Sequence, residues 1–188
     1  PYHGDLHHRW VFMTAFGSIA DDLLDAVQGT CFAAYALRAL GAEIGEDCCL
    51  FYGALLEFDL LRMDSYASTG SECDLTCHTV ENMVVKFAPV TISKGAAMRS
   101  AAAGLPGGGL GTMATLSAGS QVLKGEVVPA AEFWSGLPAS FSSTVDDARS
   151  AFEGLRPPAV EGEFTPEGIA SALGLSLPGA WKLFAAKA

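Results

Sequence analysis

The amino-acid sequence predicts a mainly β protein, a triangular solenoid of parallel strands with short α-helices at both ends. Three observations support this prediction. Large apolar residues recur every six positions, small residues follow them at a fixed offset of four, and 21 of the 188 residues are glycine. A repeat of six residues supplies one short strand and one turn, so that three repeats complete a coil of about 18 residues. The glycines suit the many tight turns of such a coil.

The repeat is most regular in the middle of the chain. Its large positions are Ile92, Met98, Gly104, Leu110, Leu116 and Val122, with Gly104 the one exception in size. Its small positions are Ala96, Ala102, Gly108, Ala114 and Ser120. A less regular copy upstream has Met63, Thr69 and Leu75 at large positions and Ala67 and Cys73 at small ones. We expect the large side chains to fill the interior of about four to five coils, and the small ones to lie where the chain bends.

The phase of the repeat breaks once. Leu75 and Ile92 are 17 residues apart, one short of a full coil, and residues 77–83 lie at the break. We interpret this stretch as a loop or bulge that projects from the solenoid. Segments that interrupt a regular scaffold often carry function.

The segments on either side of the repeat are predicted to be helical. The expected organisation is an N-terminal helical segment (1–43), a β-helix (44–139) and a C-terminal helical tail (140–188). Residues 22–40 have helical spacing with a break at which Thr30 can cap a second helix. In the tail, Ser143 or Thr144 begins a helix through Phe152, and further short helices begin near Thr165 and Pro178. The tail would either cap the last coil or dock on another protein.

Composition excludes several classes of protein. With 11 basic and 21 acidic residues, a net charge of −10 and no basic run, nucleic acid is not an expected partner. Residues 100–123 carry no charge, but their six glycines make a poor helix, so no transmembrane span is expected. Five cysteines without the spacing of a secreted scaffold indicate reduced thiols. We therefore expect a reducing intracellular compartment: the cytoplasm, or a plastid or mitochondrial interior if a leader has been removed.

Residues 29–139 resemble a known family. The matching pieces are Leu37–Gly45, Asp59–Met63, Thr76–Asn82, Lys86–Ile92, Lys124–Val127 and Trp134–Ala139. They are similar to the C-terminal hexapeptide domains of nonribosomal-peptide-synthetase-like adenylation proteins of the ε-poly-lysine synthetase type. The resemblance implies the left-handed β-helix of the hexapeptide-repeat transferase superfamily. It also implies an acyltransferase-like scaffold, usually a homotrimer, that takes acyl groups from CoA or from a carrier-protein thioester.

The resemblance also suggests catalytic residues. A loop histidine acts as general base in the superfamily, and His78 is the only histidine in the matched region. It can take a proton from a hydroxyl or amine that attacks a thioester, and Glu81 could orient it. The alternative is a loop histidine with a structural hydrogen bond. A metal held by Cys73, Cys77 and His78 is not expected, because the repeat points Cys73 inward. A three-histidine zinc site is not expected either, since the other histidines lie far upstream.

Departures from the family pattern leave two functions open. Leu137 and Ser140 stand where the closing motif usually has asparagine and a basic residue. Between Ile92 and Ser140 the only cations are Lys94, Arg99 and Lys124, few for holding the phosphates of CoA. The chain is therefore either an acyltransferase-like domain, active or degenerate, or a non-catalytic scaffold subunit of a larger, possibly organellar, protein assembly that docks through its C-terminal tail.

Overall fold

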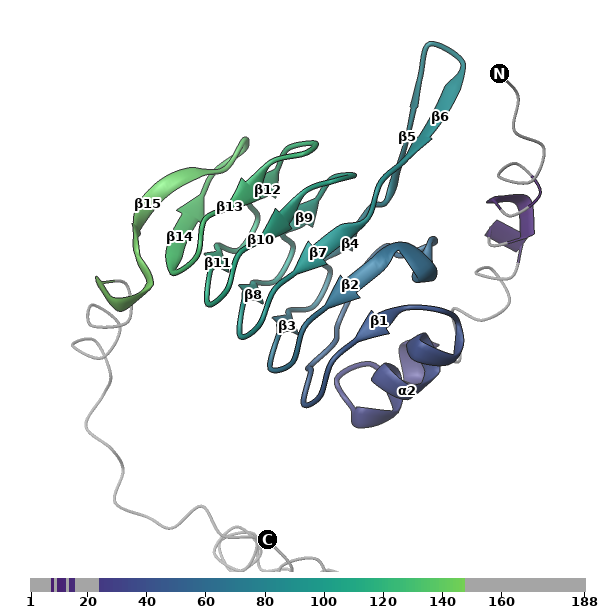
Figure 1. The fold of residues 1–188 in the computed structure, drawn as a ribbon, viewed down its shortest axis with the longest axis horizontal. Helices are drawn as coiled ribbons and strands as arrows, with labels where there is room; N and C mark the ends of the chain where they lie inside the picture. Colours follow the sequence, from purple (N-terminus) through teal and green to yellow (C-terminus); the bar gives the residue numbers. More distant parts are fainter. Residues whose placement is uncertain (1–7, 9, 13, 16–23, 148–188) are drawn as a thin grey trace, which may run out of the picture. The chain divides into compact units, whose positions relative to one another are not determined.

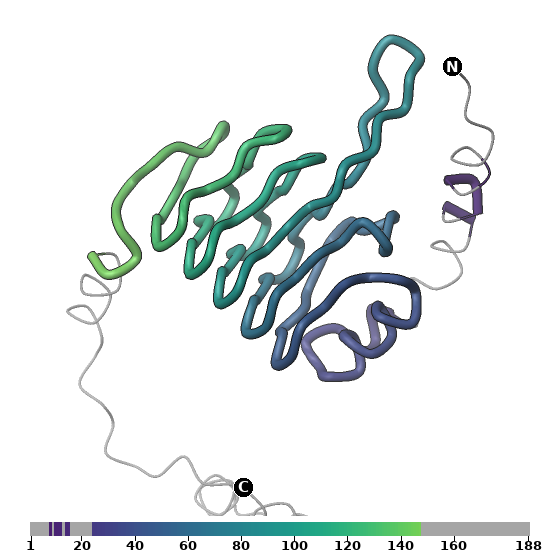
Figure 2. The backbone as a smooth tube through the Cα atoms, in the orientation of Figure 1, coloured from purple at the N-terminus to yellow at the C-terminus, as the bar shows by residue number. Residues whose placement is uncertain are grey.

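Short parallel strands stack into three flat sheets, which form the three sides of a β-helix (Figures 1 and 2). The computed structural model describes residues 8, 10–12, 14, 15 and 24–147, all within a compact unit that spans residues 1–150. The first sheet contains β1 (Glu43–Ile44), β2 (Leu61–Met63), β7 (Val90–Ile92), β10 (Gly109–Leu110) and β13 (Val127–Val128). The second contains β3 (Ser68–Thr69), β8 (Ala97–Met98), β11 (Thr115–Leu116), β14 (Glu132–Ser135) and β15 (Ser140–Thr144). The third contains β4 (Asp74–Leu75), β9 (Ala103–Gly104) and β12 (Gln121–Val122).

The register of the sheets confirms the predicted coil length. Leu110 pairs in parallel with Ile92 on one side and with Val128 on the other, each 18 residues away along the chain. Leu116 pairs with Met98 at the same separation. Three hexads therefore complete one coil, and each coil hydrogen-bonds to the next through its backbone.

The interior is filled as the repeat predicts. Every predicted large position from Ile92 to Val122 is buried, and so are the small positions Ala96, Ala102 and Ala114. Gly104 is the exception in size because its neighbours already fill the space. A Cβ atom there would lie 3.2 Å from Val90 Cγ1 and 3.8 Å from Met98 Cε.

The N-terminal end of the β-helix is covered by α2 (Cys31–Ala39), as Figure 1 shows. Thr30 caps this helix, because its hydroxyl accepts a hydrogen bond from the backbone N–H of Phe32. Residues 24–27 are also helical, so the predicted break before Thr30 is confirmed. Leu37 is fully buried against the first coil, and Arg38 Nε donates to the carbonyl of Ile44 at 2.7 Å. No helix among the described residues is long and apolar enough to cross a membrane.

The C-terminal end differs from the expectation. Residues 140–144, placed in the helical tail by the sequence analysis, form β15, which pairs antiparallel with β14. The edge of β14 offers unpaired backbone groups, and the chain returns along it to satisfy them. The predicted start of a helix at Ser143 or Thr144 is confirmed at Thr144, because Thr144 Oγ1 accepts from the backbone N–H of Asp147 at 3.2 Å and residues 145–147 are helical. The remainder of this helix, predicted to run through Phe152, lies outside the described residues. The predicted helices near Thr165 and Pro178 lie outside the described residues.

The predicted break in phase is a β-hairpin that projects from the coils (Figure 1). It consists of β5 (His78–Glu81) and β6 (Val84–Phe87), which pair antiparallel. Asn82 and Met83 form its two-residue turn with φ of 50° and 64°, the left-handed pair that a type I′ turn requires. One coil earlier, the same corner holds the short 3₁₀ helix η1 (Phe58–Leu60). The hairpin and the segment before η1 together position the candidate site.

Candidate functional site

His78 lies at the base of the hairpin against a buried carboxylate. Its Nδ1 atom is 2.8 Å from Oε1 of Glu57, the residue that precedes η1. The Glu57 side chain is 5% exposed and that of His78 is 22% exposed. An acidic side chain is almost never buried to this extent unless it is paired. The contact joins two successive coils at one corner of the β-helix.

The geometry of the pair decides which imidazole nitrogen is available. The distance is within ion-pair range, but Nδ1 and Oε1 are not aligned as a hydrogen bond. In the part of the chain that the structure describes, neither Nδ1 nor either Glu57 oxygen has a hydrogen-bond partner, and all three atoms are buried. Nδ1 is therefore not among the solvent-exposed atoms of the His78 side chain. This leaves Nε2 as the ring nitrogen that can meet a substrate.

Two aromatic rings border the imidazole. Phe87, directly opposite His78 in the hairpin register, has its ring centroid 6.4 Å away at an interplanar angle of 48°. The Trp10 ring is also 6.4 Å away, in an edge-on arrangement at 65°. Apolar neighbours lower the local dielectric, which strengthens the attraction between Glu57 and a protonated His78. A positive charge that develops on the imidazole during a reaction would therefore interact strongly with the Glu57 carboxylate.

Cys77, beside His78, is not a candidate nucleophile. Its side chain is fully buried. Burial raises the pKa of the Cys77 thiol to about 12, and the negative charge of Glu57 adds to the increase. A thiol attacks only as the thiolate. Cys73 is equally buried, and among the described residues no group of three metal-ligating side chains comes together.

Glu81 does not lie against His78. Residues three apart in a strand point to opposite faces and lie about 10 Å apart, so Glu81 cannot reach the imidazole along β5. Its carboxylate instead lies 3.1 Å from Lys86 Nζ and forms a second ion pair with Lys124. The carboxylate that contacts His78 is Glu57. The one sequence signal for Glu57 is its position as an acidic residue between Leu56 and Phe58 in an apolar run.

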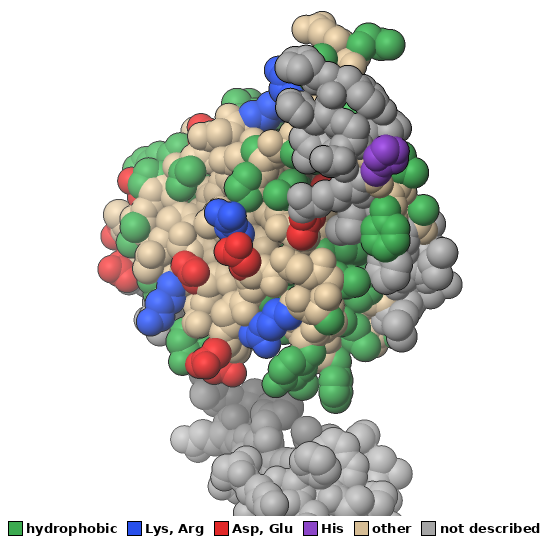
Figure 3. Space-filling view, turned by 45° about the vertical axis from the view of Figure 1, so that its right-hand side comes forward, with side chains coloured by type: hydrophobic (Ala, Val, Ile, Leu, Met, Phe, Trp, Pro, Cys, Tyr) green, Lys and Arg blue, Asp and Glu red, His purple; other side chains and the backbone are tan. Residues whose placement is uncertain are grey.

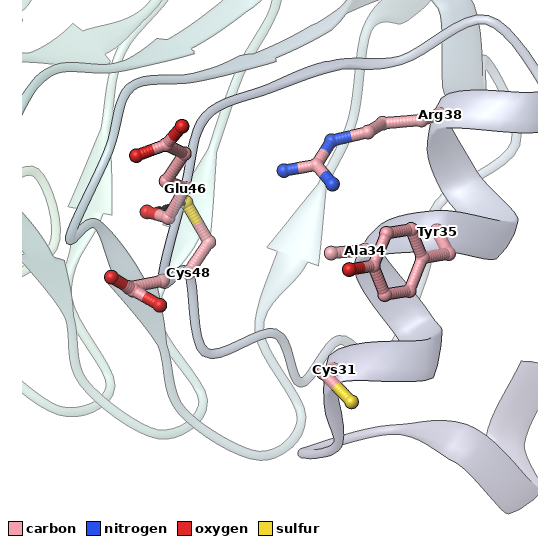
Figure 4. Close-up of a pocket in the computed structure, with 7 residues that line it drawn as sticks. Cys31, Ala34, Tyr35, Arg38, Glu46 and Cys48 are labelled. Atoms are coloured by element: carbon pink, nitrogen blue, oxygen red, sulfur yellow. Dashed lines mark hydrogen bonds between the residues drawn. The ribbon is translucent and has the colours of Figure 1, made fainter.

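A hollow lies between α2 and the first coil (Figure 4). It has a volume of about 240 Å³ and is lined by Cys31, Ala34, Tyr35, Arg38, Glu46, Asp47 and Cys48. The Arg38 guanidinium donates to the carbonyl oxygens of Ile44 and Gly45, and burial raises the pKa of the Cys48 thiol. Because a thiol attacks only as the thiolate, Cys48 is not an activated nucleophile. The His78 site remains the candidate for catalysis.

The comparisons with solved structures establish the fold. Over 72% of this chain and 88% of the other, the structure matches a maltose O-acetyltransferase from Clostridium difficile 630 with 14% identity and a TM-score of 0.58. A hexapeptide-repeat-containing acetyltransferase from Vibrio cholerae matches over 71% of this chain and 92% of its own, with 13% identity and a TM-score of 0.51. The same enzyme in complex with acetyl coenzyme A matches with a TM-score of 0.50 and 14% identity, over 70% of this chain and 87% of that one. The predicted fold, a mainly β left-handed parallel β-helix, is confirmed.

The sequence comparison is narrower. The chain is 27% identical over 118 residues to a delta-poly-L-ornithine synthetase of Acinetobacter baumannii (strain AB307-0294). The match covers 63% of this chain but only 9% of the synthetase, so the chain spans less than a tenth of the length of this relative. No family model matches the sequence.

Proposed function

We propose that this chain transfers an acyl group from a thioester to an amine or a hydroxyl, with His78 as the general base. One observation carries the proposal: His78 Nδ1 is buried 2.8 Å from the buried Glu57 carboxylate, while the remainder of the imidazole is partly exposed. An acid behind one ring nitrogen and solvent access at the other is the arrangement a positioned general base needs. Glu57 is a positioning residue, because it acts only through His78.

The reaction follows from these positions. Nε2 of neutral His78 takes the proton of the acceptor N–H or O–H as that atom attacks the thioester carbonyl carbon. The new C–N or C–O bond forms, the C–S bond breaks, and the leaving thiolate takes the proton from the imidazolium. The negative charge of Glu57 stabilises the imidazolium between these two events. The Phe87 and Trp10 rings limit the access of water to the imidazole.

The comparisons support this class of reaction. Two structural neighbours are acetyltransferases, and one of their structures contains acetyl coenzyme A. An acyl thioester of CoA is therefore a donor to test here, alongside a thioester on a carrier protein. On the face shown in Figure 3, lysine and arginine side chains lie in small separate groups, several beside acidic ones. Lys86 and Lys124 are both paired with Glu81, which leaves them poorly placed to hold the phosphates of CoA. The assembly we propose for this function is a homotrimer.

The test measures thiol release from acetyl-CoA and from acetyl-N-acetylcysteamine with a panel of amines and sugars as acceptors. His78→Gln should lower kcat by at least about 100-fold, the usual contribution of a general base. Glu57→Gln should lower kcat without changing KM, and Glu57→Asp should restore part of the loss. Glu81→Gln is the matched control and should leave both constants unchanged. Wild-type turnover by His78→Gln would refute the role of His78.

A second candidate function is supported by a different observation. The side chains of Phe32 and Tyr35 on the outward face of α2 are 65% and 63% exposed. A helix that is apolar on both faces is normally covered. This favours the alternative in which the chain is a non-catalytic scaffold subunit of a larger assembly. The scaffold reading requires that the wild-type chain releases no thiol above the rate of buffer with any acceptor of the panel, whereas acyl transfer requires that it does.

A further inference from the structure

The two faces of the β5–β6 hairpin differ in chemistry. Residues directly opposite in an antiparallel pair share one face, and successive residues alternate between faces. The pairs His78–Phe87 and Val80–Val85 therefore lie on one face, and the pairs Thr79–Lys86 and Glu81–Val84 lie on the other. We call the face of His78, Val80, Val85 and Phe87 the apolar strip. Apart from His78, its side chains are all apolar.

The polar face is directed toward the later coils. Glu81 pairs with Lys86 on the hairpin and with Lys124, which lies in the corner between β12 and β13. The apolar strip is on the opposite side of the hairpin, the side on which His78 meets Glu57 of an earlier coil. The apolar strip therefore faces away from Lys124.

Exposure along the apolar strip increases from the imidazole outward. The His78 side chain is 22% exposed, Val85 is 36% exposed and Val80 is 63% exposed. At about 3.3 Å per residue, the strip reaches about 7 Å from His78 to Val80. A continuous apolar surface thus begins at the proposed catalytic base and ends in solvent.

We propose that the apolar strip binds the hydrocarbon chain of the donor thioester, so that the site takes acyl groups longer than acetyl. This rests on the proposed function, because His78 must hold the acceptor atom about 3 Å from the carbonyl carbon that carries the chain. The chain attached to that carbon then starts beside His78, where the strip starts.

The size and charge of the strip favour a hydrocarbon chain over a protein partner. A stable protein interface needs about 800 Å² from each side. Val80, Val85 and Phe87 cannot supply this area, since even a fully exposed aromatic side chain offers at most about 250 Å². Among the residues of the hairpin, the strip also has no charged rim on its own face to orient a protein. An uncharged chain of several methylene groups matches both its dimensions and its lack of charge.

The experiment uses unreactive probes, the S-alkyl thioethers of N-acetylcysteamine from ethyl to octyl, with the full chain. Full burial of one methylene group favours binding about fourfold. On a strip that covers the chain from one side, we expect the dissociation constant to fall about twofold per methylene. Methyl NMR of labelled valines should show shifts at Val80 and Val85 that grow with chain length. Equal shifts at Val84 and Val127 would mean non-specific adsorption and would overturn the proposal.

Matched variants separate the strip from the rest of the hairpin. Val80→Ser and Val85→Ser should flatten the dependence on chain length while affinity for the ethyl probe stays within twofold. Val84→Ser, on the polar face, should keep the full dependence. The proposal would be overturned if the dissociation constant of the wild-type chain did not depend on the length of the alkyl chain. It would also be overturned if sedimentation showed a changed oligomeric state in Val80→Ser, because the strip would then be a protein interface.

The outcome is distinguishable from failure of the proposed function. If thiol release is observed but is equally fast with acetyl and octanoyl thioesters, acyl transfer stands and the apolar strip is refuted. If the probes bind with the expected dependence on length but His78→Gln keeps wild-type turnover, the strip binds alkyl chains and the role of His78 is refuted.

Discussion

Replacing Glu57 with methionine should make the folded protein more stable. Both carboxylate oxygens of Glu57 are buried and have no hydrogen-bond donor among the described residues. A buried polar group without a hydrogen bond costs about 1–3 kcal/mol, and the contact with His78, which is not a hydrogen bond, offsets only part of this. Methionine has a similar length, carries no charge and is flexible enough to fill the same space. His78 loses no aligned hydrogen bond, because its Nδ1 has none with any described residue.

We expect Glu57→Met to raise the free energy of unfolding by about 1–3 kcal/mol, the cost of a buried polar group that has no hydrogen bond in the part of the protein that the structure describes. For a protein of this size, each kcal/mol corresponds to an increase in Tm of about 2–4 °C. The assay is urea unfolding, in which the midpoint should rise while the slope m stays the same. Thioester turnover should fall in the same variant, as expected for a residue kept for function at a cost in stability.

Glu81→Met is the control, because Glu81 is partly exposed and pairs with Lys86 and Lys124 at the surface. Its effect should stay within about 0.5–1 kcal/mol. The reasoning is refuted if Glu57→Met lowers stability by more than about 1 kcal/mol, since removal of a carboxylate is that costly only when the folded protein satisfies it.

Two further predictions concern stability. The Cys77 pKa is raised from 9.0 to about 12 in the folded protein, so between these values only the unfolded chain releases the thiol proton. The contribution of the protonated Cys77 thiol to the free energy of unfolding should be fully present below pH 9. It should be lost, by up to about 4 kcal/mol, as pH rises toward 12. Cys77→Ala should make this decline shallower in urea midpoints measured from pH 8 to 11, and an unchanged slope would contradict the raised pKa. Gly45→Ala should destabilise by about 1–3 kcal/mol or more, because its Cβ would lie 2.3 Å from the backbone nitrogen of Ser65. Gly119→Ala should cost less, because a Cβ atom at Gly119 would meet open space and Ala101 already adopts a similar positive φ. A larger loss of Tm in Gly119→Ala than in Gly45→Ala would contradict this reasoning.

The repeat could be predicted because its cause is local. Each hexad must place one large side chain inward and one small one at the bend, and the coil length follows from three such steps. For that reason the buried positions from Ile92 to Val122, the inward direction of Cys73 and the projection at the phase break could all be inferred from spacing. The strand formed by residues 140–144 could not, because its partner is the free edge of β14 rather than a pattern within the segment.

The sequence by itself determined the coil, its interior and the position of His78 on a projecting segment, because each depends on residues a few positions apart. Only the tertiary structure decided which acid meets the imidazole. Glu81, three residues along the strand, points to the opposite face and pairs with Lys86 and Lys124. Glu57, 21 residues earlier, arrives at His78 because one coil stacks on the next at the same corner. The stacking of coils brings together residues that are far apart in the sequence, whereas the alternation of side chains along a strand places residues that are close in the sequence on opposite faces.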